Sequence, residues 1–241
     1  MYDKDAVSKV QAALEREVHL DLRSTPIDIQ IKEGKVCLEG EVSHISTKKQ
    51  ALRTVAHLSE VVEVVDKLRV ATPHHPGDGA TRDAVCRWLM HDTNFQNCVI
   101  RICTKGREES LRDGERENAS GNILVGVEDG VVSLSGHVIS LSHKRLAGVL
   151  AWWAQGVRDV ENLLHVAPPE EDNDDEIVDG LRLVLECDPY VHAEQITIES
   201  HGGTVVLEGE VSSEDERLRT ETDAWCLHAV DRVTNHIRVR A

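Results

Sequence analysis

One strand pattern occurs three times in this chain of 241 residues, and its fixed spacing constrains the fold more than any other feature. The three stretches are EGKVCLEGEVS at 33–43, DGVVSLSGHVIS at 129–140 and GGTVVLEGEVSS at 202–213. In each copy a second glycine follows the first by six residues, and a valine follows that second glycine by thirty residues. Spacing that is fixed at several points predicts three copies of one structural unit.

The first half of each unit has the pattern of a β-hairpin. In the first copy Ile27, Ile29 and Ile31 precede the turn, and Val36 and Leu38 follow it. Alternation with a period of two predicts strands with one buried face. The dipeptides Asp-Gly and Gly-Gly favour a two-residue hairpin turn, because the turn needs positive φ. The second glycine falls on the buried parity, which predicts a bulge or the close approach of a helix.

Helical periodicity surrounds each hairpin. One helix precedes it, and a second, rich in small apolar residues, is expected at about 46–59, 142–155 and 214–228, before a last strand. We therefore predict the α+β class: three tandem two-layer sandwiches, each an α-β-β-α-β unit whose three-stranded mixed sheet carries two helices on one face. Two polar linkers punctuated by proline separate the units. The predicted domain boundaries are 1–71, 81–167 and 174–241.

The repeat resembles the BON domain, a family named for bacterial osmotically inducible and nodulation proteins. The closing motif of that family is matched by Gly156, Val157, Val160, Asn162, Leu164 and Val166. The third copy departs from it at Ala229, where the family usually has glycine, and the first departs at Glu60 and Asp66. The resemblance covers nearly the whole chain. It implies a non-enzymatic protein linked to envelope integrity, osmotic stress, phospholipid binding or, in one cytosolic case, potassium binding.

The charge of the chain argues against nucleic acid as a partner. The net charge is −16, and residues 168–241 alone carry 19 acidic and 6 basic side chains. A chain this acidic, with 3% aromatic residues, lacks the basic groove and the stacking platforms that nucleic acid requires. No apolar run is long enough for a transmembrane helix, and the N-terminus lacks the apolar core of a secretory signal. We therefore expect a cytoplasmic protein, or a periplasmic one if the true N-terminus is missing.

The sequence contains no recognisable reaction centre. The six cysteines form no CxxC pair and have the pattern of reduced, buried thiols. The pair His74-His75 has no spacing typical of a metal site, and Asp188-Pro189 has the pattern of a turn that ends a helix. Asn162, Asn235 and Asp66 fall on the buried parity of the last strand, where bonding to neighbouring backbone is expected. We predict no catalytic residue, no metal and no cofactor.

The second copy contains an insertion at 98–122. Its first six residues, CVIRIC, have the pattern of a strand. The rest, 104–121, is charged and punctuated by glycine, which predicts a mobile loop. The alternative is an arm that binds a partner.

Two adjacent tryptophans are the candidate binding residues. Trp152 and Trp153 lie on the second helix of copy two, where neighbouring side chains point about 100° apart. Trp152 therefore packs at the edge of the core, whereas Trp153 is expected to be partly exposed. Trp153 packs against a neighbouring repeat in one interpretation and marks a partner site in the other.

Two functional hypotheses follow from these observations. The first is a non-enzymatic binding or scaffold protein that acts on a protein or a membrane-lipid partner, with a link to envelope or osmotic stress. The second is a cytosolic sensor in which a cation such as potassium, or a small molecule, changes the arrangement of the domains. The sequence leaves the partner and the oligomeric state open.

Overall fold

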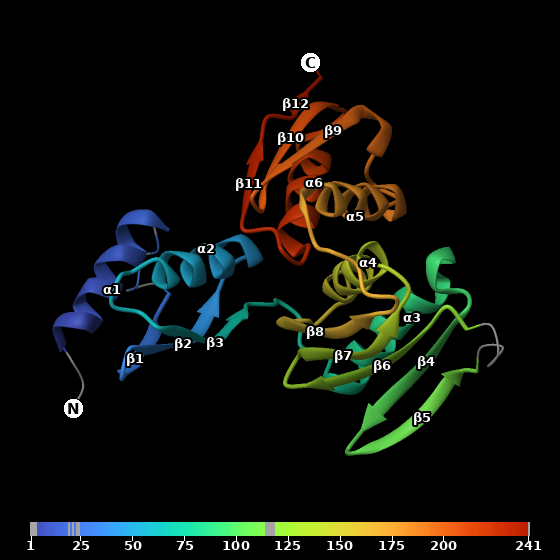
Figure 1. Cartoon of the computed structure of the whole chain (residues 1–241), viewed down its shortest axis with the longest axis horizontal. Helices are drawn as coiled ribbons and strands as arrows, with labels where there is room; N and C mark the ends of the chain where they lie inside the picture. Colours follow the sequence, from blue (N-terminus) through green and yellow to red (C-terminus); the bar gives the residue numbers. More distant parts are fainter. Residues whose placement is uncertain (1–3, 19, 21, 23–24, 114–118, 241) are drawn as a thin grey trace. The chain divides into compact units, whose positions relative to one another are not determined.

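A computed structural model describes residues 4–18, 20, 22, 25–113 and 119–240 of the chain. They form two compact units, residues 1–71 and 72–241. The first unit is the first repeat, and the second unit contains the second and third repeats. Three separate mixed sheets confirm the predicted α+β class (Figure 1). The separate domain boundaries at 81–167 and 174–241 stay a prediction.

The first repeat has the predicted element order. Strand β1 pairs antiparallel with β2, and β3 pairs parallel with the other edge of β2. The helices α1 and α2 contact each other and the same sheet. The buried side chains of the sheet and helices form one apolar cluster between the two layers. The elements are α1 (Lys4–Glu17), β1 (Ile27–Lys32), β2 (Lys35–Val42), α2 (Ile45–Ala56) and β3 (Glu63–Val70).

The second repeat has the same unit with two additional strands. Its sheet follows the order β5-β4-β6-β7-β8, and the turn η1 (Thr93–Phe95) connects its first helix to β4. The elements are α3 (Asp78–His91), β4 (Cys98–Thr104), β5 (Arg107–Arg112), β6 (Gly121–Glu128), β7 (Val131–Val138), α4 (Leu141–Trp152) and β8 (Asp159–Val166).

The third repeat returns to the basic unit. Its last strand is interrupted, so that β11 and β12 lie end to end along one edge of β10, and β9 pairs with the other edge. The elements are α5 (Asp174–Cys187), the turn η2 (Ala193–Gln195), β9 (Ile196–His201), β10 (Thr204–Val211), α6 (Glu214–Cys226), β11 (Arg232–Asn235) and β12 (Arg238–Val239).

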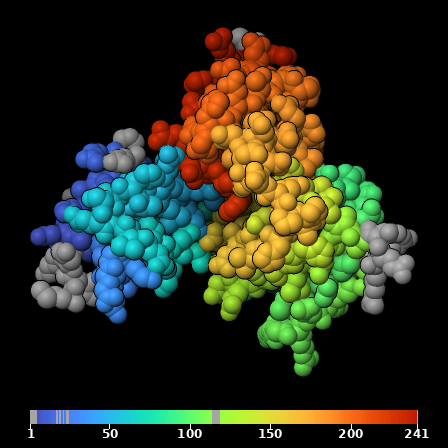
Figure 2. All heavy atoms as spheres, in the orientation of Figure 1, coloured from blue at the N-terminus to red at the C-terminus, as the bar shows by residue number. Residues whose placement is uncertain are grey.

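The insertion in the second repeat is mostly a β-hairpin. The strand predicted from CVIRIC is confirmed as β4, but the predicted mobile loop at 104–121 is wrong over β5. Lys105 and Gly106 have φ values of 50° and 76°, which is the geometry of a two-residue hairpin turn. Figure 2 shows this hairpin as the green projection at the bottom of the view. Residues 114–118 of the predicted loop lie outside the described residues.

In every repeat, the second strand of the hairpin has a glycine where the neighbouring backbone leaves no room for a side chain. Gly136 has a φ of 117°, and a Cβ atom there would lie 2.0 Å from the carbonyl oxygen of Asn122 on the neighbouring strand. The corresponding distance is 2.1 Å at Gly209 and 2.7 Å at Gly40. The predicted close approach of a helix is therefore wrong, because the backbone at the neighbouring strand makes the contact. Any side chain here would push the two strands apart.

The polar residues that recur in the repeats bond to the backbone of their own repeat. The Asp78 carboxylate, at the start of α3, accepts bonds from the turn amides of Asp129 at 3.1 Å and Gly130 at 2.9 Å. Asp174 does the same in the third repeat, with the amides of Gly202 and Gly203. These bonds close the hairpin onto the first helix, because successive turn amides form a small anion-binding hollow.

The last strand is tied to the second helix in the same way. The side-chain nitrogen Nδ2 of Asn162 donates to the Lys144 carbonyl at 2.7 Å. The Nδ2 atom of Asn235 donates to the Arg217 carbonyl at 3.2 Å. In the first repeat Asp66 instead pairs with the ammonium group of Lys48 at 2.9 Å. The predicted structural role of these residues is confirmed.

We expect Ala229→Gly to stabilise the second unit by about 1 kcal/mol. Ala229 has a φ of 68°, a left-handed conformation that is strained for any residue with a Cβ atom, and Gly156 has a φ of 85° at the corresponding position of the second repeat. Urea unfolding followed by tryptophan fluorescence measures the change. Ala224→Gly, in the interior of α6, is the control and should destabilise by about 1 kcal/mol or more. A decrease in stability for Ala229→Gly would contradict the strain.

Candidate functional site at the junction of the second and third repeats

Trp152 and Trp153 lie at the end of α4, where the second repeat meets the third. Trp152 is the last residue of the helix and Trp153 follows it. Both side chains are half-buried, and both pack against one core cluster that extends through the second and third repeats. The partial exposure predicted for Trp153 is therefore confirmed. The partner-binding role of the two residues stays a prediction.

Trp153 also contacts the third repeat through polar atoms. Its indole Nε1 donates a hydrogen bond of 2.8 Å to Oδ1 of Asp223, on α6. Its ring meets that of Trp88 edge to face, with 5.3 Å between the centroids. The guanidinium of Arg219 lies 5.7 Å from the centroid of the Trp153 ring and 4.8 Å from that of Tyr190. The Trp153 ring thus packs against the neighbouring third repeat, which is one of the two interpretations of this residue.

Two buried carboxyl groups form the centre of this junction. Asp223 and Asp188 are each 2% exposed, and we call them the carboxyl pair. Asp188 follows α5; its Oδ1 accepts a bond of 3.0 Å from the amide of Tyr190, as expected for a turn, and its Oδ2 accepts one from Arg219. One guanidinium therefore neutralises one of two adjacent buried carboxyl groups.

Burial raises the pKa of Asp223 well above its ordinary value. The charge of Asp188 and the hydrogen bond between the two carboxyl groups raise this pKa further, and Trp153 and Arg219 oppose them. No donor reaches Oδ2 of Asp223 among the described residues. A proton on Oδ2 of Asp223 would account for both the raised pKa and the oxygen that no donor reaches. A neutral Asp223 donates a hydrogen bond to Asp188, which leaves one negative charge beside Arg219.

Arg145, from α4, closes a second part of the same junction. It is 1% exposed and donates to the Glu176 carbonyl at 3.1 Å and to the His228 carbonyl at 3.5 Å. It also pairs with the carboxylate of Asp172 in the linker. Gly180 on α5 makes room for it, since a Cβ atom at this glycine would lie 2.7 Å from Cδ of Arg145. One side chain thus binds the linker and both ends of the third repeat's helical layer.

Sequence reasoning missed Arg145 and the carboxyl pair. Asp223 follows Thr220 by three residues, so it lies on the apolar stripe that the sequence predicts for α6. An acidic residue on a buried stripe was therefore the available signal for Asp223. The position of Arg145 depends on contacts between repeats, and no spacing within one repeat indicates them.

The geometry of the junction is structural in character. The carboxyl pair is too buried for a substrate to reach it in this conformation. Burial also raises the pKa of the nearby Cys187 thiol to about 12, which keeps the thiol protonated and unreactive. Among the residues that the structure describes, no group of three His, Cys, Asp or Glu side chains is placed to hold a metal ion, and this includes His74 and His75. None of the described helices is long and apolar enough to cross a membrane.

A family model identifies the type of repeat. The family model of the BON domain matches residues 2–72, 107–168 and 173–241. Osmotically-inducible protein Y of Escherichia coli (strain K12) is 28% identical over 127 residues, which is 50% of this chain and 63% of that protein. Two structures of CdsD, a structural protein of the type III secretion system of Chlamydia trachomatis, are 15% identical with a TM-score of 0.24. The alignments cover 100% and 98% of this chain, and 100% and 92% of the CdsD chains.

We expect Asp223→Asn to stabilise the second unit at neutral pH and to reduce its pH dependence. With the pKa of Asp223 raised in the folded state, the folded chain binds more protons than the unfolded chain above about pH 4. Its contribution to stability therefore falls as pH rises toward the folded pKa. The amide keeps a donor for Asp188 and has no proton to lose.

Urea unfolding between about pH 4 and pH 8 tests this expectation through the difference in stability between variant and wild type. Asp179→Asn is the matched control, because Asp179 is exposed on α5. A stability difference that does not grow with pH for Asp223→Asn, or that grows equally for the control, would contradict a protonated Asp223.

We expect Arg145→Leu to destabilise the second unit by about 2–4 kcal/mol, because two carbonyl groups at the junction and Asp172 lose their buried donor. The third repeat should then exchange its amide hydrogens before the second, instead of opening together with it. Hydrogen exchange read by mass spectrometry measures the difference between the repeats. Arg87→Leu, on the exposed side of α3, makes the same change away from the junction and should leave both repeats unchanged.

Proposed function

The chain belongs to the BON-domain family, and from that premise we propose that it is a non-enzymatic binding and scaffold protein with a role in osmotic or envelope stress. The similarity to osmotically-inducible protein Y supports the link to stress. Neither the family nor this relative is known for catalysis. We place the protein in the cytoplasm, as its sequence favours.

One observation carries the non-enzymatic part of the proposal: the polar residues that recur are already bonded within their own repeat. Asp78 and Asp174 close hairpin turns, and Asn162 and Asn235 bind helix carbonyls. A catalytic centre needs a nucleophile, an acid or a metal held against a reacting group. The residues that recur here therefore maintain the fold of each repeat and supply no reactive group. A repeated fold of this kind suits a scaffold.

The rigid part of the scaffold is the second unit. Arg145 and the pair of Trp153 with Asp223 join its two repeats through buried polar contacts. Such contacts are costly to break, so the unit presents its surfaces in one arrangement. A fixed arrangement favours a folded protein partner, while the net charge of −16 disfavours phospholipid membranes that are themselves anionic.

Purification of the tagged chain from cells under osmotic stress tests the scaffold proposal. We expect specific protein partners to be enriched, and flotation with vesicles of anionic phospholipid to retain little of the chain. A tagged, unrelated protein of similar net charge controls for capture by charge alone. The proposal would be contradicted if the tagged chain and the tagged control protein recovered the same proteins, and if neither anionic nor zwitterionic vesicles retained the chain.

The division into two compact units favours a second candidate, a sensor whose unit arrangement responds to a cation. Small-angle scattering in potassium chloride and in sodium chloride of equal concentration separates the two candidates. A change in the radius of gyration that potassium alone produces supports the sensor. Equal curves in both salts support the scaffold.

A further inference from the structure

The junction of the second and third repeats has two polar parts that respond differently to pH. Arg145 forms the first part, through two carbonyl groups of the third repeat and the carboxylate of Asp172. A guanidinium group keeps its proton in proteins, so these contacts persist as pH changes. The second part is the hydrogen bond of 2.8 Å from Nε1 of Trp153 to Asp223, and we call this contact the latch.

The latch ends on a buried carboxyl group whose charge is not balanced. The charged groups that face Asp223 are Asp188, from the end of α5, and Arg219, on α6 itself. From α4 it receives the uncharged indole of Trp153, and the buried side chains of β10 in the same core are apolar. One cation therefore faces two carboxyl groups, so ionisation of both leaves a buried negative charge without a partner.

The latch lies at the edge of the junction, where it can open without unfolding either repeat. Trp153 is half-buried and follows the last residue of α4. Tyr190, which stacks on Arg219 beside the Trp153 ring, is 68% exposed. Release of the Trp153 ring breaks one hydrogen bond to α6 and one cation–π contact, and it leaves the strands and the helix interiors intact.

Ionisation of Asp223 opposes closure of the latch. In the closed junction burial raises the pKa of Asp223 well above its ordinary value, which the residue regains when water reaches it. Between these two values the closed state binds more protons than the open state, so closure weakens as pH rises. A difference of one proton changes the ratio of open to closed molecules by up to about tenfold per pH unit.

We propose that the latch opens as pH rises: loss of the proton from Asp223 releases Trp153 from α6, while Arg145 and the shared apolar core keep the two repeats joined. The closed latch corresponds to the Trp153 ring packed against the third repeat. The open latch frees the same ring for contacts with other molecules. This device goes beyond the proposed function, because it concerns a movement within the second unit and requires no partner.

Exchange of the Trp153 indole hydrogen with water, measured by NMR on the full chain between about pH 5 and pH 9, tests the proposal. The resonance is assigned by its absence in Trp153→Phe. A closed latch protects this hydrogen, so its exchange should accelerate over this range at least about tenfold more than exchange in a free tryptophan amide does. Far-UV circular dichroism should stay constant, because both repeats remain folded.

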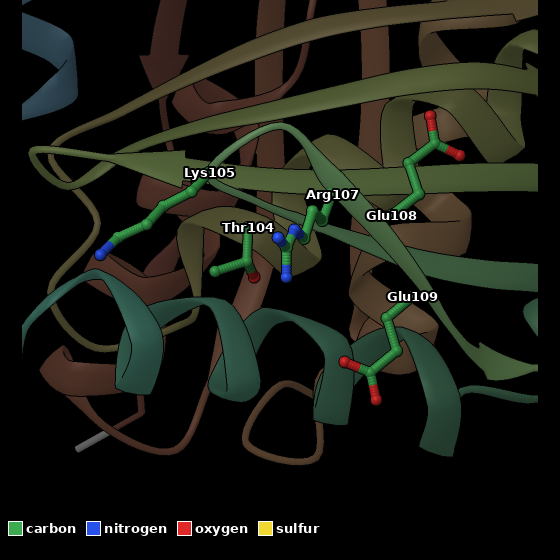
Figure 3. Close-up of a pocket in the computed structure, with 5 residues that line it drawn as sticks. All are labelled: Thr104, Lys105, Arg107, Glu108 and Glu109. Atoms are coloured by element: carbon green, nitrogen blue, oxygen red, sulfur yellow. The ribbon is translucent and has the colours of Figure 1, made fainter.

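Three variants separate the latch from other effects of pH. Asp223→Asn has no proton to lose and should abolish the excess acceleration. Asp188→Asn keeps the oxygen that accepts from the backbone but removes the like charge, so it should reduce the excess. Glu109→Gln is the matched control and should behave as the wild type does, because Glu109 is exposed on the β4–β5 hairpin. Figure 3 shows the Glu109 side chain in a hollow of about 630 Å³ that other charged residues line.

Slower exchange of the indole hydrogen at higher pH would overturn the proposal, because ionisation would then strengthen a latch that stays closed. Absence of the excess in the wild type, its persistence in Asp223→Asn, or its loss in Glu109→Gln would overturn it as well. If Asp223→Asn does not fold, an unchanged excess in Asp188→Asn has the same meaning. These outcomes leave the scaffold proposal standing, because that proposal is tested by the partners that the chain retains.

Discussion

Every repeat in this chain depends on a two-residue turn of positive φ that brings two strands together around a glycine. The turn sets the register of the hairpin, and the register places the second glycine opposite a carbonyl oxygen that leaves no room for a side chain. The turn amides then receive the carboxylate of Asp78 or Asp174, which positions the first helix over the sheet. The two-layer architecture follows from that local geometry, since both helices must cover the apolar face that the register creates.

The junction between the second and third repeats obeys a different constraint. Here polar groups are buried by contacts that exist in only one place along the chain, so each donor and acceptor must be satisfied across the junction. Arg145 satisfies carbonyl oxygens of the third repeat, and the raised pKa of Asp223 favours a proton within the carboxyl pair. Buried polar contacts of this kind add less stability than apolar packing would, but they admit fewer alternative arrangements. That property suits a unit that must present two repeats in one fixed orientation.

The repeat unit was predictable from the sequence because local patterns determine it. Alternation around Gly34, Gly130 and Gly203 predicted each hairpin, and the apolar stripes predicted the helices. The strand β5 was missed because Lys105-Gly106 is a weaker turn signal than Asp-Gly, and because the β5 side chains are charged on both faces. The burial of Arg145 and Asp188 was not predicted, because it depends on contacts between repeats. Asp223 lay on a predicted stripe, but its hydrogen bond to Trp153 depends on how α4 and α6 meet.

Three copies of one scaffold also show which surface properties the fold leaves free. The buried rows of the three sheets are alike, because each must pack against two helices. The outer rows differ in charge, from Asp28, Glu39 and Lys67 to Leu124, Ser135 and Leu163, without a change of register. Charged side chains help a sheet face to resist association, so the exposed rows are where the three copies differ in surface chemistry. Repetition therefore fixes the fold of each copy, and the exposed rows are free to differ from copy to copy.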